Sequence, residues 1–196
     1  MKTMRGGRQS RGLYELLGYF NAVECPTHTL EMIEVGCYQG ESTAIFAANF
    51  KYVYAVDCWQ DGVDPFWKSH ENMALIENQF DLRMSVYANV TKIKDLSMSA
   101  AKKFDSMVDF VYIDASHDYE SVVNDIKAWL PFVRSGGWIG GHDYGVAGCH
   151  VDKAVLNTLG NPLRLFSDSS WLHRVRGRSL NALQMRAESI PLQAAA

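Results

Sequence analysis

The stretch IEVGCYQGEST, from Ile33 to Thr43, decides the fold. It runs from a short apolar segment through a turn with two glycines, Gly36 and Gly40, into residues that suit a helix. A helix start exposes unpaired N–H groups, and glycine lets a ligand approach the backbone closely. The dinucleotide fingerprint G-x-G-x-x-G is incomplete, because Tyr38 occupies the place of the second glycine. The turn therefore favours a nucleoside ligand without phosphates over a dinucleotide.

An acidic residue, Asp57, closes the next apolar run, about twenty residues after Gly36, which is the usual interval to a ribose-binding acid. A carboxylate at that place accepts hydrogen bonds from both hydroxyls of a ribose. Taken alone, a turn with two glycines also suits an ordinary tight connection between a strand and a helix. Strand, turn, helix, strand and terminal acid together favour a cofactor that carries a ribose.

Short β-branched runs alternate along the chain with segments of helical periodicity. The runs are Glu31–Val35, Tyr52–Val56, Val90–Ile93, Val108–Ile113 and Trp138–Gly140. Helical spacing appears in Met73–Met84 and from Val122 to Leu130. The alternation predicts an α/β fold with a doubly wound, mostly parallel sheet and helices on both faces. Two later runs, Leu163–Phe166 and Trp171–Val175, predict a closing antiparallel hairpin.

The composition is that of one globular domain, with 196 residues of which 47% are hydrophobic and 21% charged. Residues 1–196 are expected to form this domain, with a basic tail over 1–11 and a weakly structured tail over 180–196. No apolar run approaches the ~18 residues of a membrane helix, and no apolar segment follows the first positive charges. Four scattered cysteines suit a reducing compartment. We therefore expect a cytoplasmic protein without a membrane partner.

The charge balance also bears on partners. The formal net charge is −3, which provides no general positive field for a polyanion. On this ground we expect no nucleic-acid partner.

Polar side chains follow the fourth and fifth apolar runs. Asp114 and His117 come after the fourth, and His142 and Asp143 after the fifth. Ligands of an open parallel sheet bind outside the carboxyl ends of its strands, so these four residues and Asp57 are expected at one edge. Two imidazoles and two carboxylates suit a divalent cation or proton transfer.

A structural role for the first of these acids stays open. Asp114 has the residue type and position to cap a helix expected from Ser116 to Trp129. In that case its carboxylate would bind backbone N–H groups and take no part in chemistry.

The strings IEVGCYQGEST, VYAVDCW, DFVYIDASHDYESVVNDIKAWL and SGGWIGGHDY resemble the class I S-adenosylmethionine-dependent methyltransferases. The likeness extends from about Glu31 to Trp171 and is greatest to a small branch with metal-dependent O-methyltransferases of glycosylated natural products. It implies a Rossmann-like, seven-stranded sheet with a reversed last strand. It also implies S-adenosylmethionine as cofactor and a hydroxyl on a small molecule or sugar as methyl acceptor.

The resemblance further implies which residues contact the cofactor. The methionine end would be surrounded by Glu34, Gly36, Gly40, Ser42 and Thr43. Asp57 would hold the ribose, and Asp114 would border the same site. The adenine would meet Asp95, Leu96 and Ser97.

In the branch that the chain resembles, an Asp-x-x-His supplies a metal ligand and a general base, and an acidic pair after the next strand supplies further ligands. The matching positions imply catalytic roles for Asp114 and His117, with His117 as the base, and a metal set of Asp114, His142 and Asp143. His142 replaces a carboxylate of that branch, and Mg²⁺ prefers oxygen ligands. Three alternatives stay open: Mg²⁺ held by the two aspartates, a softer ion such as Mn²⁺, or a site without metal.

Two functions of other classes also stay open. A metal-dependent hydrolase or oxygenase would use Asp114, His117, His142 and Asp143 without adenosylmethionine, since two histidines and a carboxylate form a facial iron site. The glycine turn and its acid argue against it, because such a site needs neither. The third alternative is a non-catalytic module that only binds the cofactor. The acceptor would contact the segment from Trp59 to His70, the first helix or a second copy of the chain in a homo-oligomer.

Overall fold

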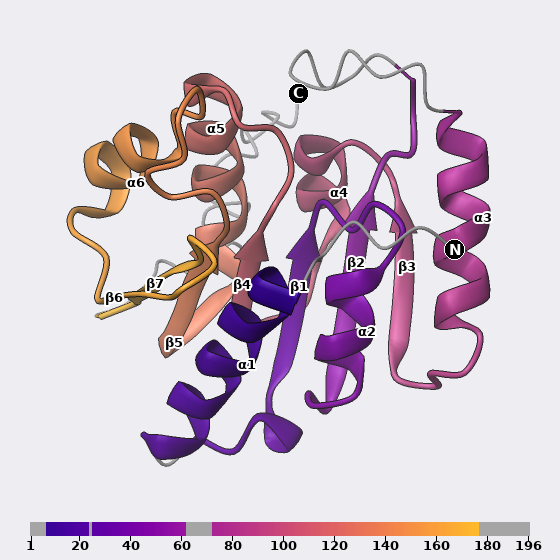
Figure 1. Ribbon diagram of the computed structural model, residues 1–196, viewed down its shortest axis with the longest axis horizontal. Coiled ribbons are helices and arrows are strands. Elements are labelled where there is room, and N and C mark those ends of the chain that lie inside the picture. The colour runs from indigo at the N-terminus through magenta and orange to yellow at the C-terminus, as the bar shows by residue number, and fades with distance from the viewer. Residues whose placement is uncertain (1–6, 24, 62–71, 177–196) are drawn as a thin grey trace, which may run out of the picture.

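The computed structural model describes residues 7–23, 25–61 and 72–176 of the chain. These residues form a central sheet covered by helices on both faces (Figure 1). The sheet has seven strands in the order β3-β2-β1-β4-β5-β7-β6. In that order the strands are Val90–Lys94, Tyr52–Asp57, Glu31–Val35, Val108–Ile113, Val133–Gly141, Trp171–Arg174 and Arg164–Leu165.

The first five strands run parallel, and β7 reverses the direction. β1 pairs in parallel with both β2 and β4, and Val35 lies opposite Val56 on one side and Ile113 on the other. β7 lies antiparallel between β5 and β6. The mostly parallel, doubly wound sheet with a C-terminal antiparallel hairpin is therefore confirmed.

The helices divide between the two faces of the sheet. They are α1 (Gly7–Ala22), α2 (Glu41–Ala47), α3 (Met73–Met84), α4 (Ser97–Lys103), α5 (Tyr119–Trp129) and α6 (Val151–Leu159), with short 3-10 turns at Thr27–Thr29 and Leu130–Phe132. On one face, Phe20 of α1 packs edge-on against Phe110 and Trp138, with ring centroids 5.1 and 4.9 Å apart. On the other face, Ile126 of α5 and Ala154 of α6 are buried in a second cluster. The sheet is thus covered on both faces, and its carboxyl-end edge is left for ligands.

Some element bounds differ from those expected. β5 begins at Val133 rather than Trp138, and β2 continues to Asp57. The first helix begins at Gly7, inside the segment 1–11 expected to be a tail. The rest of that tail, residues 180–196 and most of the segment from Trp59 to His70 lie outside the described residues. In the part of the chain that the structure describes, no helix is long and apolar enough to cross a membrane.

Candidate active site

The glycine turn after β1 lies directly against the chain that leaves β4. Gly36 and Gly40 have φ of 88° and 78°. A Cβ on Gly36 would lie only 2.2 Å from the backbone oxygen of Asp114. Asp114 N in turn donates to Val35 O at 2.8 Å. Gly36 is therefore required both for its left-handed backbone and for the close approach of these two chain segments.

The acid at the end of β2 holds the glycine turn. Asp57 Oδ2 accepts hydrogen bonds from the backbone N–H groups of Cys37 at 2.9 Å and Tyr38 at 2.8 Å, and Oδ1 accepts one from Trp59 N at 2.9 Å. Trp59 Nε1 also donates to Tyr38 O at 2.7 Å. Burial raises the pKa of the Asp57 carboxyl, and the backbone hydrogen bonds oppose this without cancelling it. Asp57 thus binds the turn that is expected to contact the cofactor.

The other residues expected near the methionine end surround this turn. Glu34 is fully buried on β1, and Ser42 and Thr43 are buried on α2. Their contact with a cofactor stays a prediction.

The residues expected near the adenine follow β3. Asp95 N donates to Asp57 O at 3.0 Å, which places Asp95 beside Asp57, and its carboxylate pairs with Lys103. Leu96 is partly exposed. Ser97 Oγ instead donates to Asp125 Oδ1 and accepts from Trp129 Nε1 at 2.9 Å. The hydroxyl of Ser97 thus joins α4 to α5, while the adenine contact stays a prediction.

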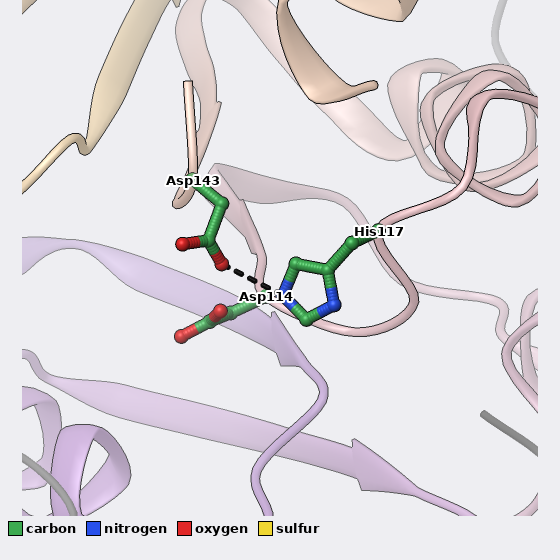
Figure 2. A group of neighbouring side chains, drawn as sticks. All are labelled: Asp114, His117 and Asp143. Carbon is green, nitrogen blue, oxygen red and sulfur yellow. Dashed lines mark ion pairs between the residues drawn. The ribbon is translucent and has the colours of Figure 1, made fainter. Parts of the chain in front are cut away.

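The acids and imidazole after β4 and β5 meet at the same edge of the sheet. Asp114, His117 and Asp143 each offer a ligand atom, and these atoms lie within 4.8 Å of one another. His117 Nε2 is 2.7 Å from Asp143 Oδ2, and Figure 2 shows this pair with Asp114 beside it. His150 N donates to His117 O at 2.9 Å and fixes the backbone behind the ring. We call these three residues the acid–imidazole group.

The carboxyl of Asp143 has a strongly lowered pKa. Burial raises its pKa, but hydrogen bonds from His117 and His142 outweigh burial and hold the pKa well below its usual range. Its φ of 61° is left-handed, a conformation that aspartate tolerates better than most residues. Tyr38, Trp59 and Ser169 are the other described non-glycine residues with positive φ. Strained backbone of this kind concentrates at functional sites, and here Tyr38, Trp59 and Asp143 lie in loops at the carboxyl edge.

His142 lies beside the acid–imidazole group and outside it. Its Nδ1 is 3.1 Å from Asp143 Oδ1 and 3.9 Å from Asp114 Oδ1. Its Nε2 faces a carboxylate that sequence reasoning missed, Asp168 Oδ2, at 3.9 Å. Asp168 lies in the turn between β6 and β7, where a Ser-Asp-Ser-Ser sequence gives only a turn signal. His117 thus lies nearer to Asp143, whereas His142 lies within 3.9 Å of both Asp143 and Asp114. The metal set of Asp114, His142 and Asp143 that the resemblance implies stays a prediction.

The capping role considered for Asp114 is wrong. α5 begins at Tyr119, and its cap is Asp118, whose carboxylate accepts a hydrogen bond from Ser121 N at 3.0 Å. Asp114 instead lines a small pocket together with His117, His142, Asp143 and Trp171. Its carboxylate therefore faces the site.

Comparisons with known proteins agree with this fold. A family profile described as a methyltransferase domain matches residues 33–144, more than half of the chain. A curated relative, an uncharacterised protein of Acanthamoeba polyphaga mimivirus, is 27% identical over 138 residues, which are 64% of this chain and 59% of the relative. The chain thus spans about three fifths of that relative's length.

Solved structures share the fold at low identity. The O-methyltransferase NovP matches with a TM-score of 0.65 and 14% identity, over 89% of this chain and 82% of that one. An rRNA methylase from Streptococcus thermophilus matches with a TM-score of 0.58 and 15% identity, over 89% of this chain and 100% of that one.

The second of these structures corrects the expectation about partners. The absence of a nucleic-acid partner was expected from the net charge of −3, and as an exclusion it is wrong, because an rRNA methylase is built on the same fold. A fold does not specify the methyl acceptor. The net charge is a sum over the whole protein surface, including parts that do not contact an acceptor. Membership of the family, in contrast, does not depend on which acceptor is methylated. With the profile match over more than half of its length and the sheet order described above, the chain belongs to the class I S-adenosylmethionine-dependent methyltransferases.

Proposed function

We propose that this chain transfers a methyl group from S-adenosylmethionine to a hydroxyl of a small molecule or sugar, with His117 as the general base. The observation that carries the proposal is the 2.7 Å pair between His117 Nε2 and Asp143 Oδ2, beside Asp114. When bound, the cofactor supplies a methyl group activated by its sulfonium sulfur. The work of the protein is to place an acceptor oxygen in line with that methyl group and to deprotonate it.

The proposal requires that the cofactor and the base, His117, lie close together, and the position of the glycine turn supports this. Because Gly36 lies against the backbone of Asp114, a ligand over this turn borders the start of the segment that carries His117. Glu34, Gly40, Ser42 and Thr43 would surround its methionine end, and Asp57 its ribose. Asp95, Leu96 and Ser97 remain the adenine candidates.

The pairing with Asp143 suits His117 to act as a base. A hydroxyl is a weak nucleophile near neutral pH, so the proton has to be removed as the methyl group is transferred. An imidazole with an unperturbed pKa near ~6.5 is matched to that task. Asp143 would accept from Nε2–H of His117, which orients the ring and leaves Nδ1 as the atom that takes the proton. The same carboxylate would stabilise the imidazolium once the proton has arrived.

The donor set of the acid–imidazole group also fits a divalent cation. Two carboxylates offer the hard oxygen ligands that Mg²⁺ and Mn²⁺ prefer, and an imidazole nitrogen suits Mn²⁺ better than Mg²⁺. Asp114 and Asp143 would hold such an ion, which would stabilise the negative charge on the acceptor oxygen. His142 is the weaker ligand candidate, because each of its ring nitrogens faces a carboxylate oxygen.

The geometry disfavours the other two functions. A facial iron site of a hydrolase or oxygenase needs two imidazoles and one carboxylate, whereas the group that assembles among the described residues has one imidazole and two carboxylates. A module that only binds the cofactor has no use for a half-buried acid–imidazole pair.

Ligand-dependent melting and methyl transfer test the proposal. Adenosylhomocysteine should raise the melting temperature and NAD should not, because a ligand stabilises the state that binds it. His117→Ala should keep the shift with adenosylhomocysteine and lose at least ~10²-fold in methyl transfer. His28→Ala, an exposed histidine in the Thr27–Thr29 turn, is the matched control and should change neither quantity.

The acceptor is tested with methyl-labelled adenosylmethionine and separate pools of sugars, phenols and ribosomal RNA. Label on a sugar or phenol oxygen is the expected result. Label on RNA alone, or undiminished transfer by His117→Ala, would contradict the acceptor or the base that we propose. No response to adenosylhomocysteine would contradict the methyl transfer itself.

A further inference from the structure

Carboxylates and imidazoles alternate in a row that extends beyond the acid–imidazole group. His117 Nε2 lies 2.7 Å from Asp143 Oδ2, and the other oxygen of Asp143 lies 3.1 Å from His142 Nδ1. The far nitrogen of His142 lies 3.9 Å from Asp168 Oδ2. The row therefore ends on Asp168, which comes from the β6–β7 turn and lies at the same edge of the sheet, because Trp171 at the start of β7 pairs with Gly141 at the end of β5.

Asp168 is held in place as a buried charge. Its side chain has no exposed surface. Oδ1 accepts a hydrogen bond from Ser170 N at 2.9 Å, while Oδ2 has no hydrogen-bond donor among the described residues and faces His142. Ser169 has a φ of 74°, and its carbonyl accepts from Tyr144 N at 3.0 Å. A buried carboxylate is costly unless a positive or donating group compensates it, and the imidazole of His142 is placed to do so.

The first helix fixes Asp168 from the other side. A Cβ on Gly12 of α1 would lie 1.9 Å from Cγ of Asp168, so the glycine backbone packs directly on the carboxyl. Glu15, one turn later on α1, accepts from Ser167 N at 3.0 Å and from Ser167 Oγ at 2.9 Å. The turn that carries Asp168 is thus clamped by α1, and its carboxyl has little room to move.

We propose that Asp168 is a positioning residue that orients His142 and, through Asp143, the ring of His117. It touches no substrate or cofactor. Removing its charge leaves Asp143 and Asp114 on the Nδ1 side of His142 and no carboxylate on the Nε2 side, so the ring loses the charge that its far nitrogen faces. The His142 ring beside Asp143 is then less well ordered, and the orientation of His117 on the other side of Asp143 changes as a result. The value of that orientation to methyl transfer rests on the role proposed above for His117.

Asp168→Asn is the direct test, because asparagine has the same shape and its oxygen still accepts from Ser170 N. The readout is the ¹⁵N spectrum of the histidine side chains at one fixed pH, which reports the hydrogen bonding of each ring and needs no acceptor, cofactor or metal. The signals of His142 and His117 should shift, and that of the distant His28 should not. Unchanged signals of His117 and His142 would overturn the proposal.

A double-mutant cycle tests whether the effect passes through residue 142. In His142→Asn the side-chain amide can still reach Asp143, but it is too short to reach Asp168. This variant alone should shift the His117 signal, and adding Asp168→Asn to it should cause no further shift. An additional shift of the same size in the double variant would show that Asp168 acts by another route and would overturn the proposal.

A glycine pair on α1 gives a test that leaves every member of the row intact and remains informative if Asp168→Asn fails to fold. Gly12→Ala places a methyl group onto Asp168, whereas Gly18→Ala on the same helix meets nothing within 4 Å. Only Gly12→Ala should move the signals of His142 and His117. Equal spectra for the two variants would contradict the proposal.

Failure of this inference can be told apart from failure of the proposed function. Adenosylhomocysteine should bind the Asp168→Asn protein within about twofold of the wild-type affinity, because Asp168 lies outside the glycine turn. Normal binding with unmoved histidine signals refutes the positioning role alone. Absent binding by the wild-type protein refutes the methyl transfer and leaves the spectra of the row as a separate result.

Discussion

The two halves of the carboxyl edge hold their acids in opposite ways. On the β1–β2 side, the oxygens of Asp57 accept from backbone N–H groups of the glycine turn and of its own loop. On the β4–β5 side, both oxygens of Asp143 face imidazole side chains. The acid of the first half is therefore held by backbone N–H groups, and the acid of the second by imidazole side chains.

The pKa values of the two acids reflect this difference. Burial raises the pKa of Asp57, since neutral N–H donors compensate its charge only in part. Burial acts in the same direction on Asp143, but the two imidazoles outweigh it and lower the pKa. A carboxylate among neutral donors suits the recognition of neutral hydroxyls, and one among imidazoles suits a cation or a moving proton.

The largest effect is expected at the contact between the two halves. Gly36→Ala should cost about 3 kcal/mol of folding free energy, because its methyl group would meet the backbone oxygen of Asp114 at 2.2 Å in addition to backbone strain. Urea unfolding measures this loss. Adenosylhomocysteine binding should be lost together with stability.

A second glycine separates the two causes. Gly136 has a φ of 84°, close to the 88° of Gly36, but a Cβ there would meet nothing within 4 Å. Gly136→Ala should therefore cost about 1 kcal/mol, which is the strain alone. Equal losses for the two variants would mean that the two halves do not depend on this close approach.

The next effect separates cofactor binding from chemistry. Asp57→Asn should weaken adenosylhomocysteine binding about tenfold or more, because the amide replaces an acceptor oxygen that the turn and a ribose would both use. Asp143→Asn should leave that affinity within about twofold and reduce methyl transfer. Calorimetric titration of both variants measures the affinities. A larger loss of binding in Asp143→Asn than in Asp57→Asn would reverse the division of labour between the halves.

The smallest effect is a pH dependence of opposite sign. The folded-state pKa of Asp57 is raised above the unfolded value near ~3.9, so the folded state binds more protons and stability from this group falls as pH rises through the folded pKa. The folded-state pKa of Asp143 is lowered, so its contribution is present above ~3.9 and is lost as pH falls toward the folded pKa.

Urea unfolding from pH 3 to pH 7 checks both signs, with Asp57→Asn and Asp143→Asn as the non-titrating references. The stability difference between wild type and Asp143→Asn should grow with pH, and the difference for Asp57→Asn should shrink. The same slope for both variants would mean that the two acids share one electrostatic environment.

Local patterns predicted the strands where side chains carry the signal. Glu31–Val35 and Val108–Ile113 have the expected bounds, because each contains β-branched or aromatic residues and ends on one. β5 begins earlier than expected. Its first half was not recognised in the sequence, because Gly136 and Gly137 give that segment a low β propensity. A Cβ on Gly137 would lie 2.6 Å from Asp109 O, so this position has to lack a side chain. A strand that needs glycine for close approach cannot be recognised by β propensity.

The difference between local sequence signals and contacts made by packing also explains what could be predicted of the site. The positions of Asp57, Asp114, His117 and Asp143 at one edge follow from a general property of parallel sheets. The hydroxyl of Ser97 could not be placed, because its partners Asp125 and Trp129 lie on another helix. Asp168 carries no local signal, and its relation to His142 depends on how β7 and α1 pack. Side chains whose partners are distant in the sequence cannot be identified from the spacing of residues along the chain.

The place of β7 between β5 and β6 also determines which parts of the site are synthesised last. A nascent chain that has emerged as far as Gly141 already contains β1 to β5, the glycine turn, Asp57 and Asp114. It still lacks Trp171, which pairs with Gly141, and Asp168 just before it. Because a domain folds as a unit, a chain that ends before this strand would lack Asp168 and the partner of Gly141, although it already carries the glycine turn.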